Sequence, residues 1–101
     1  MNCTGLKKVI LSKRLTSIPK EMFSLCSSLT EVYIPDRVSI INEGAFASCQ
    51  SLARVDLPVS LNMIGWQAFS ACTKLTEITF PAKVSNIDAE AFSACKELKN
   101  I

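Results

Sequence analysis

The five cysteines of the chain are evenly spaced, each 23 residues after the one before. They are Cys3, Cys26, Cys49, Cys72 and Cys95. Other residues keep the same step without insertion or deletion: Leu6, Leu29, Leu52, Leu75 and Leu98; Ile18, Ile41, Ile64 and Ile87; Phe23, Phe46, Phe69 and Phe92. Self-similarity at a fixed period of this length predicts a stack of repeated structural units. It constrains the fold more than any other feature of the sequence.

One repeat, residues 29–51, shows what each unit should form. Residues 31–34 alternate between polar and apolar side chains, as in a strand with one buried face. Pro35 ends that strand because it lacks a backbone donor, and residues 38–41 suit a second short extended piece. Apolar residues from position 45 onward recur at spacings of one, three and three, which favours about two turns of helix. Each unit is therefore predicted to be one 23-residue coil of a solenoid, with a parallel sheet on one face and short helices on the other.

Composition narrows the class of protein. A hydrophobic content of 49% with 20% charged residues indicates a folded chain with an ample core. The net charge of +2 gives little basis for binding nucleic acid or an anionic membrane. No apolar run approaches the roughly 20 residues of a membrane-spanning helix, and the first residues do not form a signal peptide. We expect a single array over residues 1–101, of about four repeats with both ends open, that is a fragment of a longer protein.

The repeat reads Leu-x-x-Ile/Val-x-Ile/Leu-Pro-x-x-Val-x-x-Ile-x-x-x-Ala-Phe-x-x-Cys-x-x-Leu. This pattern resembles the BspA-like class of leucine-rich repeats, which is named after a Bacteroides cell-surface antigen. The match covers nearly the whole chain. The resemblance implies a β-rich α/β fold, a right-handed leucine-rich-repeat solenoid, in a cell-surface or secreted protein. Family members with a known role resemble adhesins that bind host matrix or other proteins.

A glycine often follows the second isoleucine in this class, and here it survives only as Gly65. Asn42 and Asp88 take that position in two other repeats, and both tolerate a left-handed backbone better than most residues. Pro19 cannot adopt that conformation, so we expect the first coil to turn differently there.

The cysteines are predicted to be small buried hydrophobes beside the phenylalanines. A disulfide needs Cα atoms within roughly 7 Å, whereas packed helices of adjacent coils would lie about 8–10 Å apart. A column of single thiols cannot converge on one zinc ion, and no C-x-x-C pair is present. We therefore expect no metal and no cofactor. Cys3 and Cys95, nearest the two ends, are expected to be the most exposed and reactive, and their redox state stays open.

Candidate binding residues are sought where the repeat is broken. One outward column of the strand face alternates in charge, and the next begins with two large side chains. The first column carries Lys8, Glu31, Arg54, Glu77 and Asn100; the second carries Ile10, Tyr33, Asp56 and Thr79. The charges form either a self-neutralising ladder or a polar partner surface. Ile10 beside Tyr33 makes a small apolar spot, which is either a contact surface or ordinary cross-strand packing.

The second departure is Trp66, the only tryptophan of the chain. Its counterparts in the other repeats are polar or small: Lys20, Glu43 and Ala89. Met63, which lies nearby in the sequence, also departs from the repeat pattern. A large apolar side chain at a solvent-facing position indicates either a partner anchor or a side chain that folds back over a loop.

Catalysis has little support, because the chain has no histidine and no evident pair of facing carboxylates. We expect a non-enzymatic protein-binding module, with contacts drawn from Trp66, Met63, Tyr33, Ile10, Arg54 and Asp56. Its advantage would be a rigid surface that lowers the ordering cost of association. The alternative is a structural spacer without a ligand of its own. We expect a protein partner, a glycan less readily, no nucleic acid, no membrane insertion, and end-to-end self-association through open strand edges.

Overall fold

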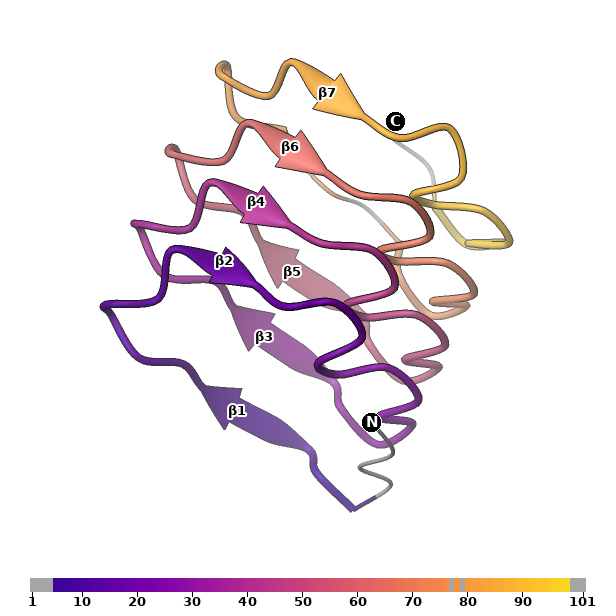
Figure 1. Ribbon diagram of the computed structural model, residues 1–101. Helices are drawn as coiled ribbons and strands as arrows, with labels where there is room; N and C mark the ends of the chain where they lie inside the picture. The colour runs from indigo at the N-terminus through magenta and orange to yellow at the C-terminus, as the bar shows by residue number, and fades with distance from the viewer. Residues whose placement is uncertain (1–4, 77, 79, 99–101) are drawn as a thin grey trace.

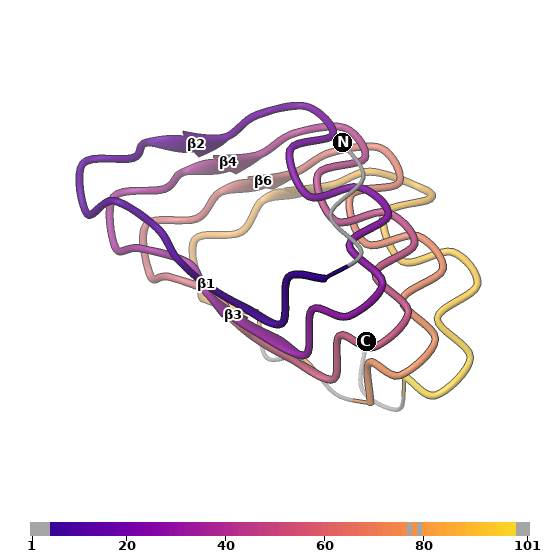
Figure 2. The ribbon, with the colours of Figure 1, turned by 90° about the horizontal axis from the view of Figure 1, so that it is seen from below.

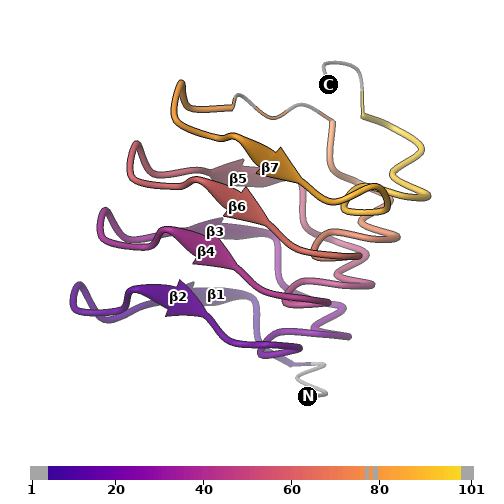
Figure 3. The ribbon, with the colours of Figure 1, turned by 45° about the horizontal axis from the view of Figure 1, so that its top comes forward.

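The computed structural model describes residues 5–76, 78 and 80–98. The chain winds through successive coils that lie one above another (Figures 1 and 3). Each complete coil gives one strand to a first sheet, bends, gives a second strand to another sheet, and returns through a run of turns (Figure 1). Four residues discussed in the sequence analysis lie outside the part of the chain that the structure describes: Cys3, Glu77, Thr79 and Asn100.

The strands of the described residues are short, and all of their pairings are parallel. The first sheet holds β1 (Lys8–Ile10), β3 (Glu31–Tyr33) and β5 (Arg54–Asp56). The second sheet holds β2 (Ser17–Ile18), β4 (Ile40–Ile41), β6 (Met63–Ile64) and β7 (Asn86–Ile87). Val9 pairs with Val32 and Val32 with Val55, so the register follows the sequence repeat without a slip. The predicted parallel stacking is confirmed, in two sheets instead of one.

The two sheets form two sides of a wedge, and the turn segments close the third side (Figure 2). Strand residues alternate so that one side chain of each pair points inward, as Val32 does between the exposed Glu31 and Tyr33. The inward columns from all three sides meet in one core that includes Ile18, Leu29, Ile34, Ile41, Phe46, Leu52, Leu61, Ile64, Phe69 and Leu75. The sheets and the turns therefore share one apolar interior.

The phenylalanines form a continuous stack through this core. Ring centroids of Phe23, Phe46, Phe69 and Phe92 follow one another at 5.4, 5.2 and 5.3 Å. The interplanar angles are 16°, 4° and 1°, so the rings are nearly parallel and lie within the usual range of offset aromatic pairs. Phe46 and Phe69 are fully buried, and each has a ring on both sides.

The predicted short helices are absent from the described residues, and this part of the fold prediction is wrong. Alternate N–H groups of the turn segments donate across the stack to the following coil, as from Phe46 to the Ala68 carbonyl at 2.7 Å. The N–H groups between them close tight turns, as from Ala47 to the Gly44 carbonyl at 3.1 Å. An α-helix would direct each N–H to the carbonyl four residues earlier. We call this bonded column of turn segments the turn ladder.

Left-handed residues allow the turn ladder to form. Positive φ angles recur at two positions of the repeat, at Glu21, Gly44 and Gln67 and at Leu25, Ser48, Ala71 and Ala94. The positions of Asn42 and Gly65 are not among them, so the expectation of a left-handed backbone there is wrong. Gly65 is needed for a different reason, because a Cβ there would lie 2.9 Å from the backbone nitrogen of Glu43 in the preceding coil.

The cysteine column lies beside the phenylalanine stack. Cys26, Cys49 and Cys72 are buried, as predicted, while Cys95 is half-buried, and all four are free thiols. The expected helix-to-helix spacing between cysteines is wrong, because the turn segments that carry them are joined from coil to coil by backbone hydrogen bonds. The thiols also bond across coils: Cys72 donates to the Phe46 carbonyl at 3.2 Å, and Cys49 and Cys95 make the equivalent bonds at 3.1 Å.

The phenylalanine stack leads to a stability prediction. Phe46→Ala or Phe69→Ala removes a buried ring with a neighbour on both sides and should lower the free energy of unfolding by about 3–5 kcal/mol. Phe92→Ala should lower the free energy of unfolding by a smaller amount, because Phe92 is only partly buried. Urea denaturation measures all three variants. Equal losses for the three would contradict the central role of the stack.

The buried thiol of Cys72 leads to a pH prediction. Burial, followed by the neighbouring Cys49 and Cys95, raises the pKa of Cys72 well above its ordinary value. Above about pH 8.5 the unfolded chain therefore loses this proton while the folded chain keeps it, so stability falls as the pH rises. Cys72→Ala removes this contribution. The free energy of unfolding should therefore fall with pH more steeply in the wild type than in Cys72→Ala, by at most about 1.4 kcal/mol per pH unit. Urea denaturation between neutral and alkaline pH tests this, and parallel curves would refute it.

Candidate binding surfaces

The outer face of the β1–β3–β5 sheet brings four of the six predicted contact residues together. Strand register places Ile10 beside Tyr33 and Tyr33 beside Asp56. Arg54 is on β5, two residues before Asp56, and points to the same face. Ile10 is 93% exposed and Tyr33 59% exposed, whereas the valines between the two columns point into the core. A shallow hollow of about 320 Å³ over this face is lined by all four residues.

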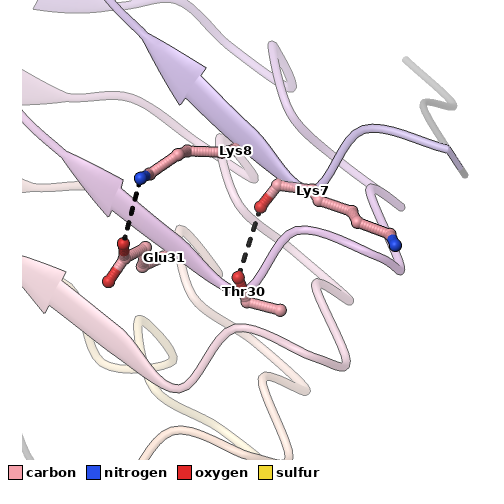
Figure 4. Close-up of polar contacts among 4 residues, drawn as sticks. All are labelled: Lys7, Lys8, Thr30 and Glu31. Atoms are coloured by element: carbon pink, nitrogen blue, oxygen red, sulfur yellow. Dashed lines mark hydrogen bonds and ion pairs between the residues drawn. The ribbon is translucent and has the colours of Figure 1, made fainter.

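Charges on this face are largely neutralised within it. Lys8 of β1 pairs with Glu31 of β3 at 3.8 Å, next to the bond from the Thr30 hydroxyl to the Lys7 carbonyl at 3.3 Å (Figure 4). The first rung of the predicted charge ladder is thus present. Arg54 instead pairs with Asp56 of its own strand, with 3.5 Å between Nε and Oδ1. Exposed pairs of this kind contribute little to stability, so their main effect is to leave the face without a strong net charge.

Tyr33 is held in place by the bend that follows its strand. Its hydroxyl donates to Oδ1 of Asp36 at 3.3 Å. The negative charge of Asp36 raises the pKa of the Tyr33 phenol, with smaller contributions from burial, this hydrogen bond and Asp56. The ring therefore stays neutral over the physiological range and presents an aromatic face to solvent.

A second hollow of about 510 Å³ lies on the other side of Tyr33, toward the bend. We call it the bend hollow. Its lining is apolar along the strands and charged at the bend: Val9, Ile10, Leu11, Lys13, Tyr33, Pro35, Asp36 and Arg37. Lys13 and Arg37 were not among the predicted contact residues. Arg37 repeats Arg14 one period later, which is a weak signal in the sequence, whereas the counterpart of Lys13 in the next repeat is Asp36.

The same sheet face continues toward the last coils. A third hollow of about 580 Å³ lies over β5 and the segment beyond residue 75, with Arg54, Val59 and Phe80 in its lining. Residues 77 and 79 of that segment lie outside the described part of the chain.

Met63 and Trp66 lie on a different surface. Met63 points outward from β6, 36% exposed, beside Ile40 of β4. Trp66 follows it and is 44% exposed, in a column that begins with the ion pair of Lys20 and Glu43 at 3.8 Å. Because β6 belongs to the second sheet, the six predicted residues divide between two sides of the wedge. The structure does not assemble them into one site.

The chain has no histidine, and within the described residues no group of three or more metal-binding side chains is found. The same residues contain no helix that is long and apolar enough to cross a membrane.

These features define a parallel solenoid of the leucine-rich-repeat class. A family described as "BspA type Leucine rich repeat region (6 copies)" matches residues 1–101. The chain belongs to this BspA-type family, and the resemblance seen in the sequence is confirmed. No curated protein matches the sequence.

Solved structures agree with this assignment. A leucine-rich repeat protein from Bacteroides ovatus is similar with a TM-score of 0.92 and 33% identity, over 98% of this chain and 26% of that one. The pneumococcal vaccine antigen PcpA has a TM-score of 0.87 and 25% identity, over 92% of this chain and 23% of that one. A leucine-rich cell-surface protein from Faecalibacterium prausnitzii has a TM-score of 0.60 and 28% identity, over 93% of this chain and 30% of that one. The chain thus spans about a quarter of the length of the first two proteins.

The contact between Tyr33 and Asp36 gives a direct test of the first surface. Asp36→Asn removes the largest cause of the raised Tyr33 pKa, so the phenol should ionise at lower pH in this variant. The chain has one tyrosine, so its ultraviolet absorbance reports this group alone. Asp88→Asn, far along the stack, serves as the control and should leave the titration unchanged. An unchanged Tyr33 pKa in Asp36→Asn would show that the two side chains are not in contact.

Proposed function

We propose that the chain is a non-enzymatic protein-binding module of a cell-surface or secreted protein, and that it binds through the outer face of the β1–β3–β5 sheet. The observation that carries the proposal is the exposure of Ile10 and Tyr33 side by side, at 93% and 59%, on a sheet whose register is fixed. Large apolar and aromatic side chains in such positions are the usual anchors of protein interfaces.

The rigidity of the face supports this proposal. Val9, Val32 and Val55 fasten the three strands to the core, so the outward side chains lose little freedom on binding. Less ordering cost leaves more of the contact energy available for affinity. The surrounding ion pairs form a polar rim, which is typical of transient protein interfaces.

The similar proteins support the expected location. One of them is a cell-surface protein and another is a vaccine antigen. We extend that location, and an adhesin-like role, to this chain as part of the proposal.

The main alternative is a structural spacer. The ion pairs of Lys8 with Glu31 and of Lys20 with Glu43 favour it, because a surface that neutralises its own charges needs no partner. Self-association is a further part of the proposal. Within the described residues, β1 and β7 each pair on one side only, and edges of this kind favour end-to-end stacking.

The proposal is tested with purified extracellular-matrix and cell-surface proteins immobilised on a biosensor. The chain should capture a partner, and Ile10→Ser combined with Tyr33→Ser should weaken capture by about 2 kcal/mol or more, roughly thirtyfold. Both side chains are exposed, so the double variant should keep the circular dichroism and urea midpoint of the wild type.

The matched control is Met63→Ser on β6 combined with Trp66→Ser in the turn after it, which should bind normally. Loss of binding in this control alone would move the site to the surface of Met63 and Trp66. Absence of any partner across the panel would favour the spacer. Binding that both double variants retain would instead place the contact on another surface and reject the proposed face.

A further inference from the structure

We propose that the bend hollow accepts an acidic protein segment that carries an aliphatic side chain. This inference rests on the proposed binding function and names the chemistry of the partner. The bend hollow lies at the edge of the Ile10–Tyr33 face, so both would belong to one contact surface.

The cations of the bend hollow come from stacked turns. Pro35 accepts a bond from the Val38 N–H at 3.2 Å, and this turn carries Asp36 and Arg37 at its tip. The preceding coil makes the same turn between Ser12 and Leu15, with 3.1 Å from the Leu15 N–H to the Ser12 carbonyl. Since the strands on both sides of these turns are in register, Lys13 and Arg14 lie one coil from Asp36 and Arg37.

These cations are not neutralised by the fold. Lys8, Lys20 and Arg54 each pair with a carboxylate. Across the described ranges, by contrast, neither Lys13, Arg14 nor Arg37 has an ion-pair partner. Asp36, the one carboxylate in the lining, accepts the hydrogen bond of Tyr33 instead.

The surplus of positive charge extends over the first coil. Residues 1–23 contain five lysines and arginines but a single acidic residue, and in the described part of the chain carboxylates of the next coil neutralise only Lys8 and Lys20 among them. Arg14 and Arg37 carry like charges at equivalent positions one coil apart and repel each other, and an anionic partner would relieve that repulsion. An acidic segment is therefore the complementary partner of this end of the face.

The apolar part of the bend hollow selects a protein segment over a glycan or a nucleic acid. Val9, Leu11 and Pro35 line it between the exposed Ile10 and Tyr33. A volume of about 510 Å³ lies within the range of pockets that enclose small ligands, so it can hold an aliphatic side chain with its flanking backbone. Sugars and phosphates would leave this apolar lining without a matching group.

The bend is also held rigid by the next coil. The Ser60 hydroxyl lies within hydrogen-bond distance of the Asp36 and Val38 carbonyl oxygens, at 2.7 Å from the latter. The turn that presents Arg37 is thus fixed before a partner arrives, which reduces the ordering cost of binding.

The experiment measures fluorescence polarisation of short labelled peptides with the 101-residue chain. The probes are a peptide of Asp and Glu around a central leucine, the same peptide with a central glycine, and a peptide of Lys around a central leucine. The acidic leucine peptide should bind saturably and more weakly as salt is added. The glycine peptide should bind roughly tenfold more weakly, and the basic peptide should not bind.

Charge-reversal variants locate the site. Lys13→Glu combined with Arg37→Glu should weaken binding of the acidic leucine peptide by roughly tenfold or more. Lys74→Glu combined with Lys96→Glu changes the net charge equally at exposed positions away from the bend hollow, and should bind within about twofold of the wild type. Both variants are exposed substitutions whose folding is checked by urea denaturation.

Three results would overturn the inference. They are no saturable binding of the acidic leucine peptide, equal binding of the leucine and glycine peptides, and equal loss in the two charge-reversal variants. A sulfated oligosaccharide could also displace both the leucine peptide and the glycine peptide from the wild-type chain equally well. That result would assign the site to a glycan instead. If partner capture on the biosensor still depends on Ile10 and Tyr33, failure here rejects the acidic partner and leaves the proposed function intact.

Discussion

The structure depends on backbone hydrogen bonds between coils on all three sides of the wedge. The two sheets provide them through strand pairing, and the turn ladder provides them through bonds such as that from Phe46 to Ala68. These bonds hold equivalent residues directly above one another, so the phenylalanine stack and the cysteine column follow from the same constraint. A single residue inserted in one strand would shift the inward side chains of that strand beyond the insertion to the wrong face.

The repeat in the sequence was sufficient to predict the stacked coils, the parallel register and the buried columns. Val32 and Phe46 occupy the positions that periodicity assigned to them. The helices could not be excluded in the same way, because an apolar spacing of one, three and three fits one face of a helix and also a series of tight turns. Whether the segment forms a helix or tight turns depends on residues with a left-handed backbone, such as Leu25 and Ser48. Leucine and serine do not favour that conformation, so the sequence does not reveal it.

The candidate site was predictable in part. Breaks in the repeat pointed to Tyr33 and Trp66, and both are exposed in the structure. Tyr33 lies on the first sheet, whereas Trp66 lies in the turn segment that follows β6 of the second sheet. This separation could not be predicted, because one sheet was expected where two are present. The bend residues Lys13 and Arg37 were missed because charged side chains at a turn are common and usually only solvated. Their importance appears only when the fold shows which cations already have partners.

The turn ladder has a direction. Glu21, Phe23 and Leu25 each donate to a carbonyl in the following coil, and later coils repeat the same sense. The cross-coil peptide dipoles on this side therefore align along the stacking direction, whereas the bonds of a parallel sheet run both ways. A coil that extends the stack must present carbonyl oxygens on one end and N–H groups on the other, so any assembly built by continuing it is head-to-tail and lacks two-fold symmetry.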